Sequence, residues 1–524
     1  MDYGIFDQNQ WMFPDVVRED GRRDADFSLL KGQCRAFQVQ FTGLTPGAAV
    51  TWSAEGAEGI RLQYFREVEV CVNRNTNALQ NGLLTTDRWE DISQDRVRRA
   101  PYRTYDPLLP ADGLCAEKET EVYCVFLTPD RETATGVRSL RIRFCCRGDE
   151  LILPVRIRVL DKQLPERTLQ LTNWYSEALV AHWHGLEYGS EAHIDMLRRY
   201  LGTMRDCHQN ICRVTFGDMK VTKADGEYIF DFSAMKRWAE LGLECGFDTL
   251  EWEPIISRPT WRDPPFTIFD IADSCKPLEC LSNPGRKYLT SFLTQFNAFL
   301  TENGWREISL VHISDEPKER CADDFRILAG IFRKYLPGIR LMDAIEIYFI
   351  EEALDIYVPK NHYYQLNRND FEALRSDRNE LWFYTCNLPG GKFLNRLLDS
   401  PLLNTRLLHW GNYRYNLTGY LHWGYFYCSE TQDPFEQTSR SPGLPAGDTH
   451  IVYPGKDGPL LSLRWLQMKC GTEDYEILRA LSLHDRGRAD ALCRRVLLSF
   501  DDYVTDTADF DAVLCELTEA YAAI

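Results

Sequence analysis

The sequence predicts a multidomain protein of the β plus α/β class: an N-terminal β-sandwich, a (β/α)8 TIM-type barrel and a C-terminal helical tail. Three observations support this fold class. The chain has 524 residues, enough for two or three domains. Residues 1–163 show strand patterns with poor helical periodicity, and beyond Pro165 short apolar strands alternate with amphipathic helices. We therefore expect a sandwich at 1–163, a barrel at 166–485 and a helical extension packed on the barrel at 486–524.

The clearest signal in the first domain is a hairpin. Apolar residues and arginines alternate through 139–144 and again through 151–160, on either side of a turn at 147–150. Such alternation is typical of strands with one buried and one solvent-facing side. A β-sandwich accommodates strands of this kind, and the polar stretch 161–165 marks its end.

The second domain contains eight strand candidates, the number that a (β/α)8 barrel requires. They lie at 169–174, 211–216, 249–253, 308–314, 339–344, 356–358, 381–386 and 419–425. Apolar residues recur at helical spacing through 288–300, and Asn303-Gly304 supplies the stop. The tail is helical from about residue 460, and we expect Gly471 to end one helix and Thr472 to cap the next.

The bulk composition limits the partners. A net charge of -18 and a pI near 5.1 argue against nucleic acid or a membrane as partner, and no apolar run approaches the ~20 residues of a membrane span. The 17 scattered cysteines and a start without a leader pattern indicate a cytoplasmic protein, although a trimmed secreted protein would begin in the same way. The 13 Trp and 25 Tyr side chains suit stacking against sugar rings, and they equally suit packing in a hydrophobic core.

The most informative motif is Asp315-Glu316-Pro317 at the end of the fourth predicted strand. Barrels place catalytic groups at strand ends, and strand alternation puts His312, Ser314 and Glu316 on one face. Asp315 can join Glu316 if the strand breaks before the proline. Two acids at a barrel mouth suit acid–base cleavage of a glycosidic or similar bond. An exposed turn that caps the following helix explains the same residues equally well.

Other strand ends are aromatic or polar, which would suit a carbohydrate subsite as well as a core. The candidate substrate-binding residues are Tyr384, Trp423, Trp252, His312, His184 and Tyr425. His182 and His184, with His362, could instead ligate a metal ion as in amidohydrolases. The ten histidines do not supply a convincing ligand set, so we expect no metal and no cofactor. Glycine-rich nucleotide motifs and a Gly-x-Ser-x-Gly elbow are absent.

Several motifs, taken in order, resemble glycoside hydrolase family 123. They are His312-Ile313-Ser314-Asp315-Glu316-Pro317, the strand 382–386, the strand 419–424, and the tail segments 453–455, 462–464 and 471–476. The resemblance implies a β-sandwich, a (β/α)8 barrel and an exo-acting β-N-acetylgalactosaminidase. It also implies substrate-assisted retention, in which the acetamido oxygen of the substrate attacks its own anomeric carbon.

The resemblance implies roles for individual residues. Glu316 would be the general acid/base, and Asp315 would orient the acetamido group and stabilise its developing charge. Repulsion between the two carboxylates should raise the pKa of Glu316 and keep it protonated. Tyr384 would bond the acetamido oxygen, and Trp423 and Trp252 would form the ring platform.

Three alternatives remain open at this point. The same machinery could act on another 2-acetamido sugar such as N-acetylglucosamine. The scaffold could carry a non-catalytic carbohydrate-binding protein, or a metal-dependent hydrolase. The partner is a glycan or small saccharide in the favoured hypothesis, and the oligomeric state is not specified by the sequence.

Overall fold

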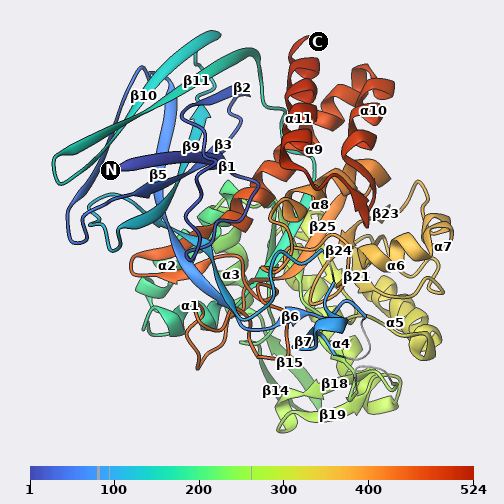
Figure 1. The fold of residues 1–524 in the computed structure, drawn as a ribbon. Helices are drawn as coiled ribbons and strands as arrows, with labels where there is room; N and C mark the ends of the chain where they lie inside the picture. The colour runs from blue at the N-terminus through green and yellow to red at the C-terminus, as the bar shows by residue number, and fades with distance from the viewer. Residues whose placement is uncertain (80–82, 94, 261–262) are drawn as a thin grey trace.

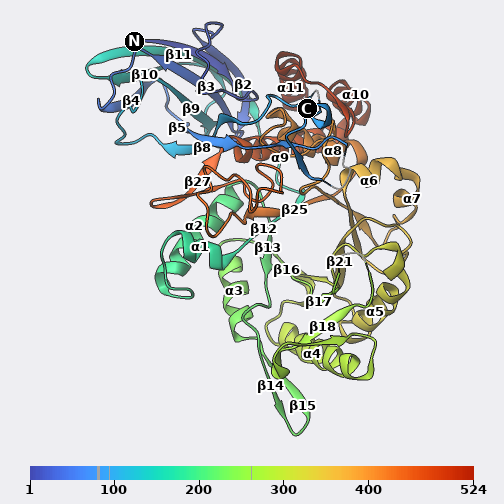
Figure 2. The ribbon, with the colours of Figure 1, turned by 60° about the horizontal axis from the view of Figure 1, so that its bottom comes forward.

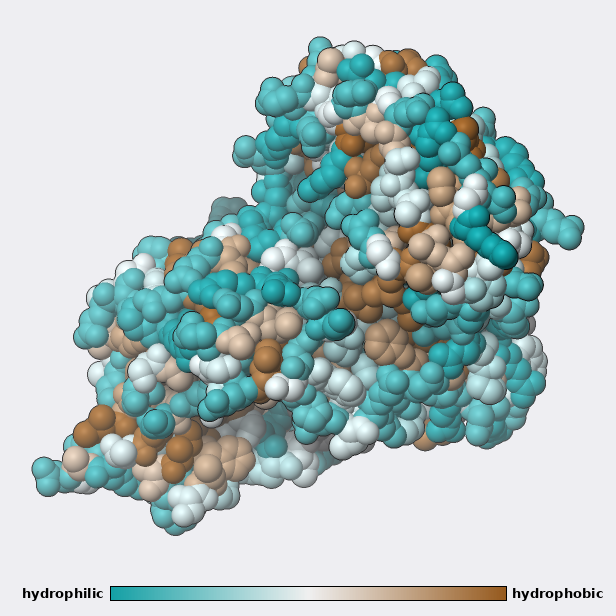
Figure 3. All heavy atoms as spheres, turned by 90° about the vertical axis from the view of Figure 1, so that its left-hand side faces the viewer, coloured by the Kyte–Doolittle hydropathy of each residue, from teal (hydrophilic) through white to brown (hydrophobic). Residues whose placement is uncertain are grey.

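The computed structural model describes residues 1–79, 83–93, 95–260 and 263–524, which form a multidomain mixed α/β protein (Figure 1). The N-terminus lies on a β-rich part and the C-terminus on a group of helices beside it. Within these described ranges, no helix combines the length and apolarity needed to cross a bilayer. Figure 3 shows one side of the molecule, on which hydrophobic residues are scattered among hydrophilic ones, as is usual for protein surfaces.

The N-terminal part consists of two sheets that share one hydrophobic core. A seven-stranded sheet has the order β1-β3-β9-β5-β8-β27-β26, and a four-stranded sheet has the order β2-β11-β10-β4. The strands from this part are β1 (Asp2–Asp7), β2 (Ala25–Lys31), β3 (Arg35–Thr42), β4 (Val50–Glu55), β5 (Ile60–Val72), β8 (Tyr102–Pro110), β9 (Thr120–Pro129), β10 (Gly136–Cys146) and β11 (Asp149–Gln163). The predicted hairpin is β10–β11, which places Leu140 and Ile142 in the core while Arg141 remains exposed.

Two strands of the seven-stranded sheet come from far along the chain. β26 (Tyr453–Gly455) pairs with β27 (Gly458–Ser462), and β27 in turn pairs antiparallel with β8. The chain therefore returns to the N-terminal sheet after the α/β part is complete. This return was not predicted, because the pairing joins segments that are distant in sequence.

The α/β part contains parallel strands in two sheets. Six have the order β13-β16-β20-β21-β22-β23, and three have the order β12-β25-β24. Each of the eight predicted regions contains a strand: β12 (Gln170–Tyr175), β13 (Ile211–Val214), β16 (Thr249–Trp252), β20 (Ser309–His312), β21 (Arg340–Ile345), β22 (Ile356–Pro359), β23 (Glu380–Leu381) with β24 (Phe383–Tyr384), and β25 (Gly419–Phe426). Across the described residues β12 and β13 have no strand pairing, so the hydrogen-bond ladder alone does not establish a closed barrel.

Helices lie outside these strands, as Figure 2 shows for α3 (Ser233–Glu244), α4 (Asn283–Glu302) and α5 (Ala322–Tyr335). The helix predicted from its apolar stripe is α4; Ser282 precedes it and caps it by accepting the N–H of Gly285, and it ends before Asn303-Gly304. The remaining helices are α1 (Glu177–Trp183), α2 (Glu191–Asp206), α6 (Asn361–Leu366), α7 (Arg368–Ala373), α8 (Leu403–Tyr415), α9 (Leu463–His484), α10 (Arg486–Val496) and α11 (Thr507–Ala522).

The predicted helix break at Gly471 is wrong. Helix α9 runs without interruption past this residue. A Cβ atom at Gly471 would lie 2.5 Å from the carbonyl oxygen of Arg406 in α8, so the glycine serves the close approach of two helices. A glycine in a helix can mark close packing as well as an end, and the local sequence does not distinguish the two.

Candidate active site

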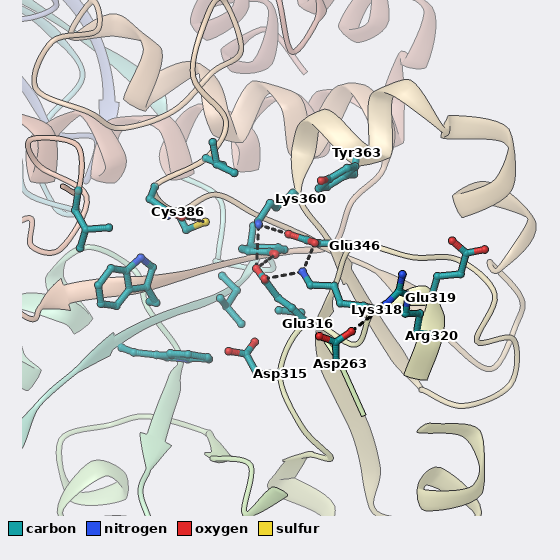
Figure 4. Close-up of a pocket in the computed structure, with 18 residues that line it drawn as sticks. Asp263, Asp315, Glu316, Lys318, Glu319, Arg320, Glu346, Lys360, Tyr363 and Cys386 are labelled. Atoms are coloured by element: carbon teal, nitrogen blue, oxygen red, sulfur yellow. Dashed lines mark hydrogen bonds and ion pairs between the residues drawn. The ribbon is translucent and has the colours of Figure 1, made fainter. Parts of the chain in front are cut away.

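A cavity of about 1060 Å³ opens where the parallel strands end (Figure 4). Its walls include side chains from both parallel sheets and from the loops that follow them. The residues that line the cavity include Trp174, Asp315, Glu316, Lys360, Tyr384 and Trp423. The predicted acid pair thus lies with two indoles and a phenol in one cavity, as expected for strand ends in this kind of fold.

The loop after β20 presents the two carboxylates. The strand ends at His312, and Glu316 has a φ of +42°, in the left-handed region that residues other than glycine rarely adopt. Arg258 donates from Nη2 to the carbonyl oxygens of Asp315 and Glu316, each at 2.9 Å. The Glu316 N–H donates to the carbonyl oxygen of Ala344 at 3.1 Å. These bonds hold a turn that lets both adjacent side chains line the same cavity.

Glu316 is surrounded by donors. Lys360 Nζ lies 3.0 Å from Oε1, Lys318 Nζ lies 3.4 Å from Oε2, and the Tyr384 hydroxyl donates to Oε1 (Figure 4). Both lysines also bond Glu346, so acidic and basic groups alternate. Burial opposes ionisation of Glu316, but the two ammonium groups and the phenol outweigh it and lower its pKa to about 2.

Asp315 behaves in the opposite way. Burial, followed by the negative charges of Glu316 and Asp343, raises its pKa to about 7. Of the two carboxyl groups, Asp315 therefore keeps its proton to higher pH, while Glu316 is ionised. The expectation that repulsion would keep Glu316 protonated is corrected, because Lys318 and Lys360 stabilise the ionised form of Glu316. Nothing in the local sequence places Lys360 beside Glu316.

Two predicted residues line the cavity. Tyr384 does so with its hydroxyl bonded to Glu316, and Trp423 does so with its indole N–H donating to Oδ1 of buried Asp448 at 3.1 Å. Trp174 is a second indole in the cavity, and its N–H donates to Oε1 of Glu251 at 2.8 Å. Trp174 was not among the predicted site residues, although it ends the first predicted strand and its position there was the available signal.

Trp252 does not line the cavity, which corrects its assignment to a sugar platform. It is fully buried, donates its indole N–H to Ser309 Oγ at 2.9 Å, and packs against Phe296 of α4. Its side chain points away from the strand ends into the layer between strands and helices. A fully buried core residue of this kind has no surface to offer a substrate.

His184 and Tyr425 also lie outside the cavity and face α2. His184 Nε2 is 2.9 Å from the Tyr200 hydroxyl, and the Tyr425 hydroxyl is 2.7 Å from Thr203 Oγ1. Tyr425 would share a face with Trp423 in a regular strand. However, the register of β12 against β25 shifts after His422, and this irregularity turns the two aromatic side chains to different sides.

His312 lies beneath the cavity rather than in it. Its ring is 2% exposed, with Nδ1 3.0 Å from Asp343 Oδ1 and Nε2 2.8 Å from Glu251 Oε1. Burial disfavours the charged ring, but the two carboxylates outweigh it and raise the pKa of His312 to about 10. His312 is therefore a buried imidazolium between two acids and does not contact a substrate directly.

The three histidines considered as metal ligands have separate surroundings. His182 Nε2 is 2.8 Å from the carbonyl oxygen of Glu430, and His184 is bonded to Tyr200. Burial, followed by the charge of Lys360, lowers the pKa of His362 to about 3. In the described ranges, His, Cys, Asp and Glu side chains form no group of three or more arranged to hold a metal ion.

A sequence model for the catalytic domain of glycoside hydrolase family 123 matches residues 174–481, more than half of the chain. The chain belongs to glycoside hydrolase family 123. The resemblance inferred from the motifs is confirmed, and the protein is a glycoside hydrolase that acts on glycans.

A solved structure of the same family shares the fold of this chain. A family 123 glycoside hydrolase from Clostridium perfringens, described in terms of glycolipid glycan hydrolysis, superposes with a TM-score of 0.77 at 15% identity, covering 100% of this chain and 97% of that one. A β-glucuronidase from Parabacteroides merdae reaches a TM-score of 0.35 at 9% identity, over 82% of this chain and 52% of that one. No curated protein matches the chain.

Proposed function

We propose that this glycoside hydrolase removes terminal β-linked N-acetylgalactosamine from glycans by a retaining, substrate-assisted mechanism. The observation that carries the proposal is that the side chains of adjacent Asp315 and Glu316 line one cavity, where their surroundings shift the two pKa values in opposite directions. Both side chains come from one loop, whereas in the usual scheme two carboxylates about 5 Å or more apart flank the glycosidic bond. The arrangement in this cavity suits a reaction whose nucleophile belongs to the substrate.

The first step uses both carboxyl groups. The acetamido oxygen forms a bond to the anomeric carbon while the glycosidic C–O bond breaks. The electron pair of the broken bond goes to the leaving oxygen. A carboxylic acid protonates that oxygen, and the other group, as carboxylate, accepts the acetamido N–H and stabilises the positive charge. The opposite pKa shifts of Asp315 and Glu316 favour one proton and one negative charge on the pair, which is the protonation state that this step requires.

In the second step, the carboxyl group that acted as acid takes a proton back. Water attacks the anomeric carbon, gives a proton to the carboxylate that acted as acid, and displaces the acetamido oxygen. The sugar leaves with its original β configuration, since the carbon has been inverted twice. No metal and no protein nucleophile takes part in this scheme.

The assignment of the proton within the pair can be tested. The family resemblance gives the acid role to Glu316, whereas the charges in the resting cavity favour the proton on Asp315. Glu316 can act as acid only if a bound substrate moves its carboxylate away from Lys360 and Lys318. The two assignments make different predictions for the variants treated in the Discussion.

We also infer that the two parallel sheets enclose one (β/α)8 barrel. The support is that Lys360, after β22 in one sheet, forms a parallel bridge with Tyr384 in β24 of the other. Side chains from both sheets also share the one cavity. The cytoplasmic location expected from the cysteine pattern remains a prediction.

The test is hydrolysis of p-nitrophenyl β-N-acetylgalactosaminide and β-N-acetylglucosaminide, each with and without a thiazoline mimic of the cyclised intermediate. We expect turnover of the galactosaminide, competitive inhibition by the mimic, and β-configured product as the first species seen by NMR. Turnover that the mimic does not affect would contradict substrate assistance. Preference for the glucosaminide would assign the same mechanism to the other sugar, and no turnover of either would contradict the proposal.

A further inference from the structure

A buried chain of hydrogen bonds joins the Trp174 indole to the loop of the acid pair. We propose that His312 is a positioning residue, whose charged ring fixes Trp174 through Glu251 and the Asp315–Glu316 loop through Asp343. The inference rests on the proposed glycosidase function, because it assigns His312 a part in that reaction. It concerns how the two ends of the cavity keep their relative placement.

The first arm of this chain runs through Glu251 at the end of β16. Oε1 of Glu251 receives the Nε2–H of His312 at 2.8 Å and the indole N–H of Trp174 at 2.8 Å. The hydroxyl of Thr172 donates to Oε2 of the same carboxylate. Glu251 is fully buried, so these donors replace the water that it lacks. The indole is thereby tied at its polar edge, with its ring in the cavity wall.

The second arm runs through Asp343 in β21. Oδ1 of Asp343 lies 3.0 Å from Nδ1 of His312, and Oδ2 accepts the N–H groups of Ile313 and Ser314 at 3.2 Å each. These peptide groups follow directly after the end of β20, where regular pairing with β21 stops. The side chain of Asp343 therefore takes over from the strand ladder and starts the turn that presents Asp315 and Glu316.

The ring must donate from both nitrogens, because each faces an oxygen of a carboxylate. Only the imidazolium form has two N–H groups. The raised pKa of His312 agrees with this geometry. Loss of the ring charge would leave two buried carboxylates with one donor between them, which is costly in a protein interior. The same charges act on Asp315, whose proton Asp343 favours and His312 disfavours.

Trp174 is further confined by its neighbours. The His312 ring packs edge-on against it with centroids 5.8 Å apart, and the Arg213 guanidinium lies 4.7 Å from the centre of the indole ring. The hydrogen bond to Glu251 sets the direction of the polar edge, which packing alone leaves free. A sugar that stacks on this indole would then meet the carboxyl groups in a fixed register.

Two variants of His312 separate the arms. Glutamine can place its amide N–H near Nε2 and keep the bond to Glu251, whereas asparagine can place its N–H near Nδ1 and keep the bond to Asp343. We expect His312→Gln to lower kcat about tenfold or more with KM near the parent value, since the acid loop loses its anchor. We expect His312→Asn to raise KM about two- to tenfold with a smaller loss of kcat, and Trp174→Phe to raise KM alike.

Equal changes of kcat and KM in the two histidine variants would overturn the proposal. Trp252→Phe is the matched control, because it also removes a buried indole N–H donor but lies outside this chain of bonds. It should lower the melting temperature and leave kcat and KM within about twofold. If Trp252→Phe changed KM as much as His312→Asn, the effect would come from a general loss of stability and not from the positioning of Trp174 by His312. If neither histidine variant folds, Thr172→Val tests the Glu251 arm by removing only one donor, and an unchanged KM would count against it.

A second readout does not need turnover. In protein labelled with 15N at the indole nitrogen, the Trp174 resonance is identified by its absence from Trp174→Phe. It should move in His312→Asn, which loses the partner of Glu251, and stay in place in His312→Gln. A resonance that is unmoved in both variants would overturn the proposal, while a moved resonance in a protein without glycosidase activity would count against the proposed function alone.

Discussion

Lys360 Nζ lies 3.0 Å from Oε1 of Glu316, inside a cavity that both residues line. Lys360 is 3% exposed and also bonds Glu346, which Lys318 reaches from the other side. Two glutamates and two lysines therefore alternate without net charge. Ion pairs of this kind are held strongly where water is excluded, because removing one partner leaves a buried charge. The resting cavity thus stabilises Glu316 as a carboxylate.

The roles of the acid pair are separated by leaving-group dependence. Glu316→Gln and Asp315→Asn should each lower kcat/KM on a natural glycan by ~10²–10⁴-fold, or about 3–5 kcal/mol of transition-state stabilisation. The variant that lacks the acid should recover on an aryl glycoside whose leaving group needs no proton. The variant that lacks the orienting carboxylate should remain slow on both substrates. Parent-like activity in both variants would remove the pair from the mechanism.

The pH profile should report the same charges. In the parent, kcat/KM should fall as pH rises through about 7, because Asp315 then loses the proton that the pair shares. Lys360→Met removes a cation that lowers the pKa of Glu316, so the acid limb of the profile should move upward from about 2 into the measurable range. Profiles of kcat/KM from about pH 4 to about pH 9 check this. Lys287→Met, at a surface pair with Glu227, is the control, and an acid limb that moves equally in both would contradict the assignment.

Asp315 should make the protein less stable as pH rises. Its pKa is about 7 in the folded state against 3.8 for an aspartate side chain in water, so the folded protein binds more protons than the unfolded chain between these values. Stability linked to this group is therefore lost across that window as pH increases. Asp315→Asn does not titrate, so its melting temperature should match the parent near about pH 4 and exceed it near about pH 8. Asp225→Asn, in an exposed turn, should show no such divergence, and a constant difference for Asp315→Asn would contradict the prediction.

Part of this site could be predicted because its signals are local. Short apolar segments marked the eight strand regions, and Asp315-Glu316 stood at a strand end in the sequence itself. Trp423 and Tyr384 were found for the same reason. A strand end can be recognised from a few consecutive residues, because the buried apolar segment and the turn residues that follow it are adjacent in sequence.

The other features of the site and fold depend on contacts between segments that are distant in sequence, which a short stretch of sequence does not reveal. Lys360 and Glu316 meet only because β22 and β20 lie in the same sheet, and β27 joins β8 after most of the chain has intervened. Tyr425 was misplaced because its position near a strand end does not reveal the irregular register of β25, which turns its side chain away from the cavity. Trp252 was misplaced because a strand end has a side facing the helices as well as a side facing the cavity.

The joint between the N-terminal sheet and the α/β part should depend on one buried ion pair. Arg464 at the start of α9 donates from Nη2 to Oδ2 of Asp106 in β8 at 2.9 Å, and both side chains are fully buried. Asp106→Ala leaves the guanidinium without its counter-charge, so we expect about 3–5 kcal/mol less stability in urea unfolding. Asp26→Ala breaks an exposed pair with Arg156 and should cost less than about 1 kcal/mol. Equal losses in the two variants would mean that β27 and its neighbouring strands hold the joint without help from this pair.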